Sequence, residues 1–198
     1  MSSNVDGRRP RRRRQNRERD IVSTAARIIH TDGFSRLNVD DLARQVGISK
    51  STLYQHYDHK SDIVIHALQF GVKSILHILT QANGSPLDRL EELLRFLHRY
   101  HEDDDSALAG IVFTEAMHLL SQDDGARQDV EAMLLAIHHV IQEAKEQGEI
   151  RQEVPDEVVI SSMFSLAVTL SAYPIPLSGV REKVHIDQML GWWRKCLS

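Results

Sequence analysis

Nine consecutive residues, from Ser49 to Tyr57, concentrate side chains that can bind a polyanion. The segment reads Ser-Lys-Ser-Thr-Leu-Tyr-Gln-His-Tyr. Hydroxyl groups donate to phosphates and base edges, a lysine reaches a phosphate or a guanine edge, and tyrosine and histidine contact the sugar-phosphate backbone. This combination on one short segment predicts a surface that contacts double-stranded DNA.

Two short helices joined by a tight turn are expected to position this segment. Asn38 is a good N-cap for the first helix, and Gly47 tolerates the positive φ of a tight turn. Ser49 caps the second helix, which we expect to run to about His56. The small Ala43 lets the two helices cross closely. A small core shared with the preceding helix is expected from Val39, Leu42, Val46, Ile48 and Leu53.

The predicted DNA contacts surround this helix-turn-helix, which spans residues 38–57. Lys60 lies just beyond it and is placed to bind a phosphate, and a run of arginines near the N-terminus can follow the DNA backbone or enter a minor groove. The full set is Asn38, Ser49, Lys50, Ser51, Thr52, Tyr54, Gln55, His56, Tyr57, Lys60, Arg11, Arg12, Arg13 and Arg14.

Residues Arg17 to about Leu68 resemble the DNA-binding domain of the TetR family of bacterial regulators. The resemblance rests on Ala25-Ala26, on Asp32-Gly33-Phe34 and on four further motifs. These are Val39-Asp40-Asp41-Leu42-Ala43, Val46-Gly47-Ile48-Ser49, Thr52-Leu53-Tyr54-Gln55-His56-Tyr57 and Lys60-Ser61-Asp62. Two positions depart from the family pattern, because Asn38 stands where threonine is usual and Tyr57 where phenylalanine is commoner. The resemblance implies a cytoplasmic, nucleoid-associated bacterial protein whose C-terminal helices carry effector binding and dimerisation.

The charge distribution agrees with a DNA-binding N-terminal end. The whole chain has a net charge of −4, but residues 1–60 hold 13 lysines and arginines against 7 acidic residues. The remainder of the chain is correspondingly acidic. Such a split predicts a basic end that meets a polyanion and an acidic body that does not.

The hydrophobic periodicity predicts an all-α fold of about nine helices, with no alternating strand pattern. We expect a disordered basic arm over residues 1–16, the DNA-binding domain over 17–62, and a helical effector-binding and dimerisation domain over 63–198. The chain has one cysteine and no apolar run of about 18 residues, so neither a disulfide framework nor a membrane segment is expected. No phosphate loop, GxSxG, HExxH or paired catalytic carboxylates occur, so no catalytic residue and no cofactor is predicted.

Two C-terminal segments predict a homodimer. Residues 158–170 are apolar on nearly every side, which requires cover on more than one face. The last segment carries apolar residues at spacings of 4, 3 and 4, a seam that suits packing on another helix. A four-helix bundle across a twofold axis would satisfy both, although burial of both faces within one subunit is the alternative. The predicted interface residues are Met163, Ala167, Ile186, Leu190, Trp193 and Leu197.

An effector cavity is the least visible feature in the sequence. Candidate lining residues on apolar helical faces are Phe96, Tyr100, Phe113, Met117, Met133, Ile137 and Phe164, all of which also suit an ordinary core. His98 and His101 share a helix face and offer a metal-responsive alternative. The leading hypothesis is a ligand-responsive repressor that binds a near-palindromic operator as a dimer. A ligand-free DNA-bound adaptor of the nucleoid-occlusion type is the other alternative.

Overall fold

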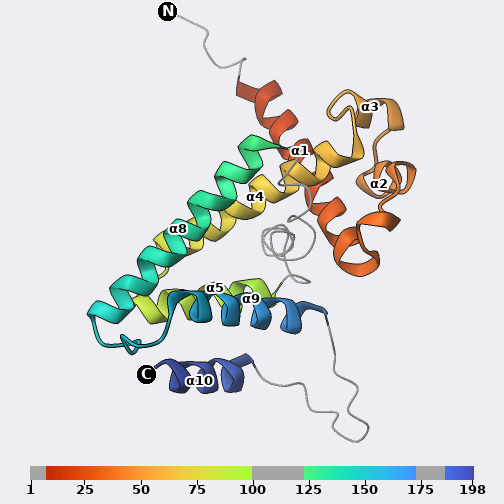
Figure 1. The fold of residues 1–198 in the computed structure, drawn as a ribbon. Helices are drawn as coiled ribbons and strands as arrows, with labels where there is room; N and C mark the ends of the chain where they lie inside the picture. The colour runs from red at the N-terminus through yellow and green to blue at the C-terminus, as the bar shows by residue number, and fades with distance from the viewer. Residues whose placement is uncertain (1–7, 100–122, 173–185) are drawn as a thin grey trace, which may run out of the picture.

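The computed structural model describes residues 8–99, 123–172 and 186–198, and every regular element in these ranges is a helix (Figure 1). This confirms the all-α fold class over the described part of the chain. The N-terminal elements are α1 (Arg8–Asp32), η1 (Phe34–Arg36), α2 (Val39–Val46) and α3 (Lys50–Tyr54). The others are α4 (Lys60–Gln81), α5 (Pro86–His98), α8 (Asp124–Glu146), α9 (Asp156–Ala172) and α10 (Ile186–Leu197). The sequence also predicts a helix over residues 106–120, which lie outside the described residues.

Helix α1 begins at Arg8, nine residues before the start expected from the hydrophobic pattern. Residues 8–16, which were expected to belong to a disordered arm, are thus helical by their backbone. Arginine has a high helix propensity, and extending a helix that is already anchored in a core avoids the cost of nucleation. Pro10 is tolerated because it lies in the first turn, where backbone N–H groups have no intrahelical acceptor.

Helices α1, α2 and α3 form a small N-terminal head. Three residues of α1 are fully buried: Ile21, Val22 and Ala25. Leu42 of α2 and Leu53 of α3 are at most 1% exposed. The other three residues expected in this core, Val39, Val46 and Ile48, are partly buried and pack against it. The predicted core between the first helix and the helix-turn-helix is confirmed.

Helix α4 connects this head to the rest of the chain. It packs against α1 at one end and against α5 and α8 along its length (Figure 1). It is also the one helix among the described residues that is long and apolar enough to cross a membrane. Eight of its residues are buried inside the protein, including Ile63, Leu68 and Ile75, so its apolar character is explained by its place in the core.

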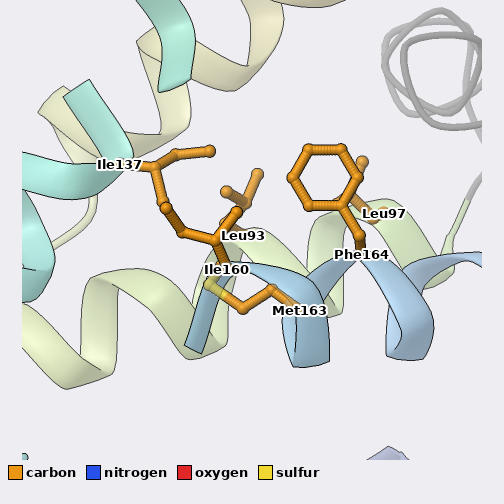
Figure 2. A pocket seen from close by; sticks show the side chains of 6 residues that line it. All are labelled: Leu93, Leu97, Ile137, Ile160, Met163 and Phe164. Atoms are coloured by element: carbon orange, nitrogen blue, oxygen red, sulfur yellow. The ribbon is translucent and has the colours of Figure 1, made fainter. Parts of the chain in front are cut away.

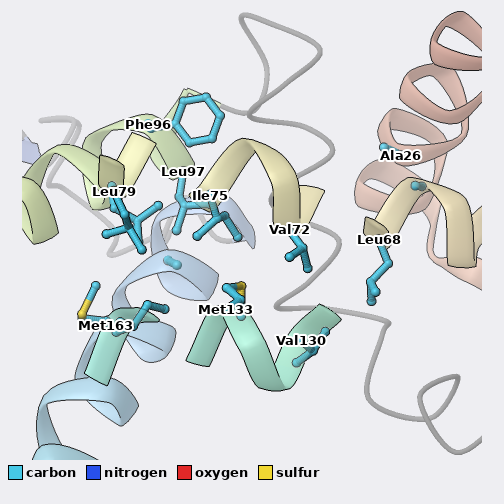
Figure 3. Close-up of a cluster of buried hydrophobic side chains, with 14 of the residues drawn as sticks. Ala26, Leu68, Val72, Ile75, Leu79, Phe96, Leu97, Val130, Met133 and Met163 are labelled. Atoms are coloured by element: carbon cyan, nitrogen blue, oxygen red, sulfur yellow. The ribbon is translucent and has the colours of Figure 1, made fainter. Parts of the chain in front are cut away.

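The body consists of α4, α5, α8, α9 and α10, and its core lies where the first four meet. Figure 3 shows Ile75 and Leu79 of α4, Leu97 of α5, Met133 of α8 and Met163 of α9 converging on this core. The start of α5 has the capping box that Ser85-Pro86-Leu87-Asp88 predicts, with both reciprocal hydrogen bonds present.

Polar contacts attach the C-terminal helices to the body. Lys145 of α8 is nearly buried and forms an ion pair with Asp156, which starts α9. Arg194 of α10 pairs with Asp88 and Glu91 of α5. Hydrogen bonds from the Ser85 backbone and from Arg194 lower the pKa of Asp88. These contacts fix α9 and α10 on their own subunit.

The seam predicted for dimerisation faces inward. Leu190, Trp193 and Leu197 of α10 are at most 4% exposed, and Trp193 donates a hydrogen bond of 2.8 Å from Nε1 to Ser162 Oγ of α9. Met163 and Ala167 of α9 are buried as well, while Ile186 is half-buried. The placement of these five buried residues in an interface between subunits is therefore corrected, because the chain's own helices cover them.

Candidate nucleic-acid interface

The turn between α2 and α3 has the backbone that the sequence predicts. Gly47 adopts φ 74° and ψ 35°, and its N–H and that of Ile48 bond back to carbonyls of α2. A left-handed residue here ends α2 and turns the chain into α3. Asn38 caps α2 by accepting from the N–H of Asp40 at 2.8 Å, and Ser49 caps α3 by accepting from Thr52 at 3.1 Å.

A polar, exposed surface covers α3 and its flanks. Ser49, Lys50, Ser51, Tyr54 and Gln55 are exposed, and Tyr54 keeps 47% of its surface accessible. The hydroxyl of Ser49 lies 2.8 Å from those of Ser51 and Thr52, so three hydroxyls form one hydrogen-bonded group. Each hydroxyl can donate or accept a hydrogen bond, and its hydrogen can rotate toward a phosphate or a base edge.

Lys50 is held by a partner that the sequence did not reveal. Its Nζ lies 2.8 Å from Oδ1 and 3.1 Å from Oδ2 of Asp40, in the first turn of α2. Both side chains are about half exposed, at 53% and 56%. The hydrogen bond to Asp40 and its negative charge raise the pKa of Lys50. The two residues are ten positions apart, which matches no helical period. The turn at Gly47 brings them together.

Lys60 occupies the edge of the same surface at the start of α4. Its ammonium stands 4.2 Å from the centre of the Phe34 ring, a cation–π distance. Burial lowers the pKa of Lys60. The aromatic ring orients the ammonium without neutralising it, which leaves its positive charge available to an anion.

Two residues predicted to contact DNA are turned inward. The His56 side chain is only 12% exposed, and its Nδ1 lies 3.6 Å from Oε1 of Glu18 in α1. Tyr57 is 4% exposed, and its ring meets His66 of α4 edge-on at 5.2 Å. Tyr57 is therefore a core residue, which corrects its assignment as a contact, and His56 presents little surface. Both lie three to four residues after the buried Leu53, and so on the side of the chain that faces the core.

The remaining predicted contacts are placed in part. Asn38 is exposed, but its side-chain oxygen is engaged as the cap of α2. Thr52 is half-buried. Arg11 to Arg14 belong to α1 by their backbone, and their side chains lie outside what the structure describes. Contact of these arginines with DNA stays a prediction.

Comparison with known proteins identifies this head. The family described as "Bacterial regulatory proteins, tetR family" matches residues 21–67, which run from the middle of α1 into α4. The matched range contains the whole helix-turn-helix. Residues 21–67 match the DNA-binding domain of the TetR family. This confirms the resemblance inferred from the motifs between Ala25 and Asp62.

Relatives and solved structures extend the similarity beyond the head. An HTH-type transcriptional regulator of Mycobacterium tuberculosis is 24% identical over 134 residues, which cover 68% of this chain and 65% of that protein. The nucleoid occlusion factor SlmA of Aliivibrio fischeri is 29% identical over 46% of this chain and 48% of its own length. The crystal structure of AibR in complex with isovaleryl coenzyme A and operator DNA superposes with a TM-score of 0.68 at 20% identity, over 91% of this chain and 97% of that one. This last likeness shows that the two chains share their fold over the body as well as over the head.

The TetR-like body contains one small apolar hollow in its described part. Leu93 and Leu97 of α5, Ile137 of α8, and Ile160, Met163 and Phe164 of α9 line it (Figure 2). Its volume of about 10 Å³ holds roughly one water-sized sphere.

The predicted pocket residues are divided between this hollow, the core and undescribed segments. Ile137 and Phe164 line the hollow, whereas Phe96 and Met133 are buried in the core. Tyr100, Phe113 and Met117 lie outside the described residues. His101 does too, and the described histidines, cysteine and acidic residues form no cluster of three that could hold a metal ion.

Proposed function

We propose that this protein is a DNA-binding transcriptional regulator that recognises a near-palindromic operator as a homodimer. Residues 17–62 are the DNA-binding unit, and residues 63–198 carry dimerisation and effector binding. The observation that carries the proposal is the exposed polar surface of α3, set on the Gly47 turn and flanked by Lys50 and Lys60. The match of this segment to the TetR family supports the same function.

The two heads of a dimer must reach successive major-groove segments. A twofold protein reads half-sites whose centres are about 34 Å apart, or a multiple of one helical turn. Helices α9 and α10 supply the surface for this pairing. Among the described side chains, Val158 of α9 is 53% exposed and Trp192 of α10 is 65% exposed, although other residues of both helices are buried in their own subunit.

Release from DNA is proposed to follow binding of a small molecule to the body. AibR was crystallised with isovaleryl coenzyme A and operator DNA, which makes an effector with a short apolar acyl group a reasonable class. The apolar hollow between α5, α8 and α9 suits such a group if these helices separate to enlarge it. Because α4 packs on both the body and α1, a shift of α5 or α8 reaches the head through a single helix.

A DNA-bound adaptor without an effector is the second candidate. The likeness to the nucleoid occlusion factor SlmA favours it, as does the small size of the described hollow. The two functions differ in their genomic sites. A repressor occupies few operators beside promoters, whereas an adaptor occupies many sites scattered over the chromosome.

Selection of duplexes from a random library by the full-length protein tests the proposed function. We expect enrichment of one near-palindromic sequence, bound by two protein chains, with affinity at least about 1,000-fold above that for a shuffled duplex. The variant Lys50→Met, Tyr54→Ala should lose most of this preference while it still folds, because both side chains are exposed. Enrichment of no sequence, together with wild-type binding by the variant, contradicts the proposal. Chromatin immunoprecipitation then separates a repressor from an adaptor.

A further inference from the structure

The ion pair between Asp40 and Lys50 places a negative charge inside the surface proposed to bind DNA. Both carboxylate oxygens of Asp40 lie within 3.1 Å of the Lys50 ammonium. A carboxylate at such a position weakens the attraction of any phosphate, so a surface built only for affinity would not contain it. Its charge suits the start of α2, and its contact with Lys50 gives it a second effect on the same surface.

The backbone on both sides of this pair is fixed before DNA arrives. The N–H of Asp40 is bound by the capping oxygen of Asn38 at 2.8 Å. Lys50 follows Ser49, whose hydroxyl is bound by the N–H of Thr52 at 3.1 Å. A free lysine side chain samples many rotamers, and ordering it on binding costs free energy. The ion pair with Asp40 favours one direction of the Lys50 side chain in advance, from across the turn.

We infer that Asp40 is a specificity-determining positioning residue, which aims Lys50 at one base or phosphate of the operator and weakens binding to DNA of arbitrary sequence. The inference rests on the proposed DNA-binding function. In the operator complex, Lys50 meets its target from the orientation that Asp40 sets. On other sequences that target is absent, and Lys50 must leave Asp40 to reach a phosphate.

The neighbouring Asp41 provides a matched control. It lies in the same first turn of α2 and carries the same charge, but it pairs with Arg44 at 2.7 Å on its own helix instead of with Lys50. Asp41→Asn therefore changes the net charge and the interaction with the start of α2 as Asp40→Asn does. The two variants differ in whether Lys50 keeps its partner.

Fluorescence anisotropy with the full-length protein tests this inference on the duplex selected by the wild type and on a shuffled duplex, at several salt concentrations. For Asp40→Asn we expect tighter binding to the shuffled duplex and a ratio of operator to shuffled affinity about 5- to 10-fold lower than in the wild type. For binding to the shuffled duplex, the slope of the logarithm of affinity against the logarithm of salt concentration should steepen by about one. The reason is that Lys50 becomes free to neutralise a phosphate, which releases one counterion from the DNA. Asp41→Asn should tighten both complexes alike and leave the ratio within about twofold.

Two further variants connect the effect to Lys50. Asp40→Glu keeps the charge and should restore most of the wild-type ratio. In a Lys50→Met background, Asp40→Asn should no longer alter the ratio, as expected for two residues that act through each other. Without DNA, NMR titration of the lysine ammonium should show a lower pKa for Lys50 in Asp40→Asn than in Asp41→Asn.

The outcomes separate this inference from the function on which it rests. If the wild type prefers its selected duplex but Asp40→Asn and Asp41→Asn change the ratio equally, the positioning role is refuted and the proposed function stands. The positioning role is also refuted, and the proposed function stands, if Asp40→Asn still changes the ratio in the Lys50→Met background. If the wild type prefers no duplex, both the proposed function and this inference fail.

Discussion

The hydroxyl of Tyr57 is buried without a hydrogen-bond partner, between α1 and the start of α4. Burial raises the pKa of this phenol, and the negative charge of Glu18 raises it further, so the group stays neutral. An unsatisfied buried hydroxyl costs about 1–3 kcal/mol in desolvation, and the aromatic ring alone fills the site. Phenylalanine is thus the better residue for stability at this position.

We therefore expect Tyr57→Phe to stabilise the protein by about 1 kcal/mol, because it removes the unpaired hydroxyl and retains the ring contact with His66. Urea denaturation followed by circular dichroism measures the change. Tyr54→Phe is the control, since Tyr54 is exposed and its hydroxyl meets solvent, and its effect should be near zero. A Tyr57→Phe protein less stable than the wild type would show that the hydroxyl has a partner in solution.

Individual side chains show where sequence reasoning about the interface succeeds. Ser49, Lys50 and Gln55 are exposed as expected, because they lie on or beside α3 where the helical period applies. His56 and Tyr57 lie three and four residues after the buried Leu53, on the side of the chain that faces the core, and their polar groups alone suggested contact with DNA. The Asp40–Lys50 pair had no sequence signal, because tertiary structure alone brings two residues in different helices together.

At the scale of elements, local capping signals predicted helix boundaries well. Ser85 and Pro86 start α5, and Gly148, with φ 73°, follows the end of α8, as residues of these types commonly do at helix ends. These signals work because each depends on a few neighbouring residues. The apolar seam of α10 was found correctly, but periodicity identifies an apolar face without naming what covers it. The cover proved to be the same subunit.

The geometry of the helix-turn-helix depends on the turn residue Gly47. An alanine at φ 74° meets no neighbouring atom within 4 Å, so the cost of Gly47→Ala is backbone strain alone, about 1 kcal/mol. Thermal denaturation should show this loss. DNA affinity should fall as well, because relaxation of the strain rotates α3 relative to α2.

Gly47→Asn serves as the control for this turn. Asparagine tolerates the left-handed region better than alanine does, so it should lose about half as much stability or less. Equal losses of stability for the two variants would contradict backbone strain as the cause. They would indicate that any side chain at position 47 destabilises the protein.

The whole molecule couples a basic head to an acidic body through α4. This helix packs on α1 in the head and on α5 and α8 in the body, so neither part can shift without a response from the other. The charge split along the sequence predicted which end meets DNA. It did not predict how two copies pair, because that depends on which apolar side chains remain exposed after the subunit has folded.

Trp192 is the most exposed large hydrophobic residue in the described part of the chain, at 65%. If α9 and α10 form the dimer interface, Trp192 is its aromatic anchor, and Trp192→Glu should raise the dimer dissociation constant by at least about 30-fold. Analytical ultracentrifugation measures this shift. Operator affinity should fall with it, while binding to a single half-site should stay unchanged, because the head is untouched.

Leu135→Glu is the matched control, since Leu135 on α8 is exposed to a similar degree, at 55%, but lies outside α9 and α10. This variant should remain dimeric. The reverse result, a dimeric Trp192→Glu and a monomeric Leu135→Glu, would move the interface to α8. The twofold axis would then lie beside the helix that packs along α4, and the separation of the two heads would be set by α8 instead of by the C-terminal helices.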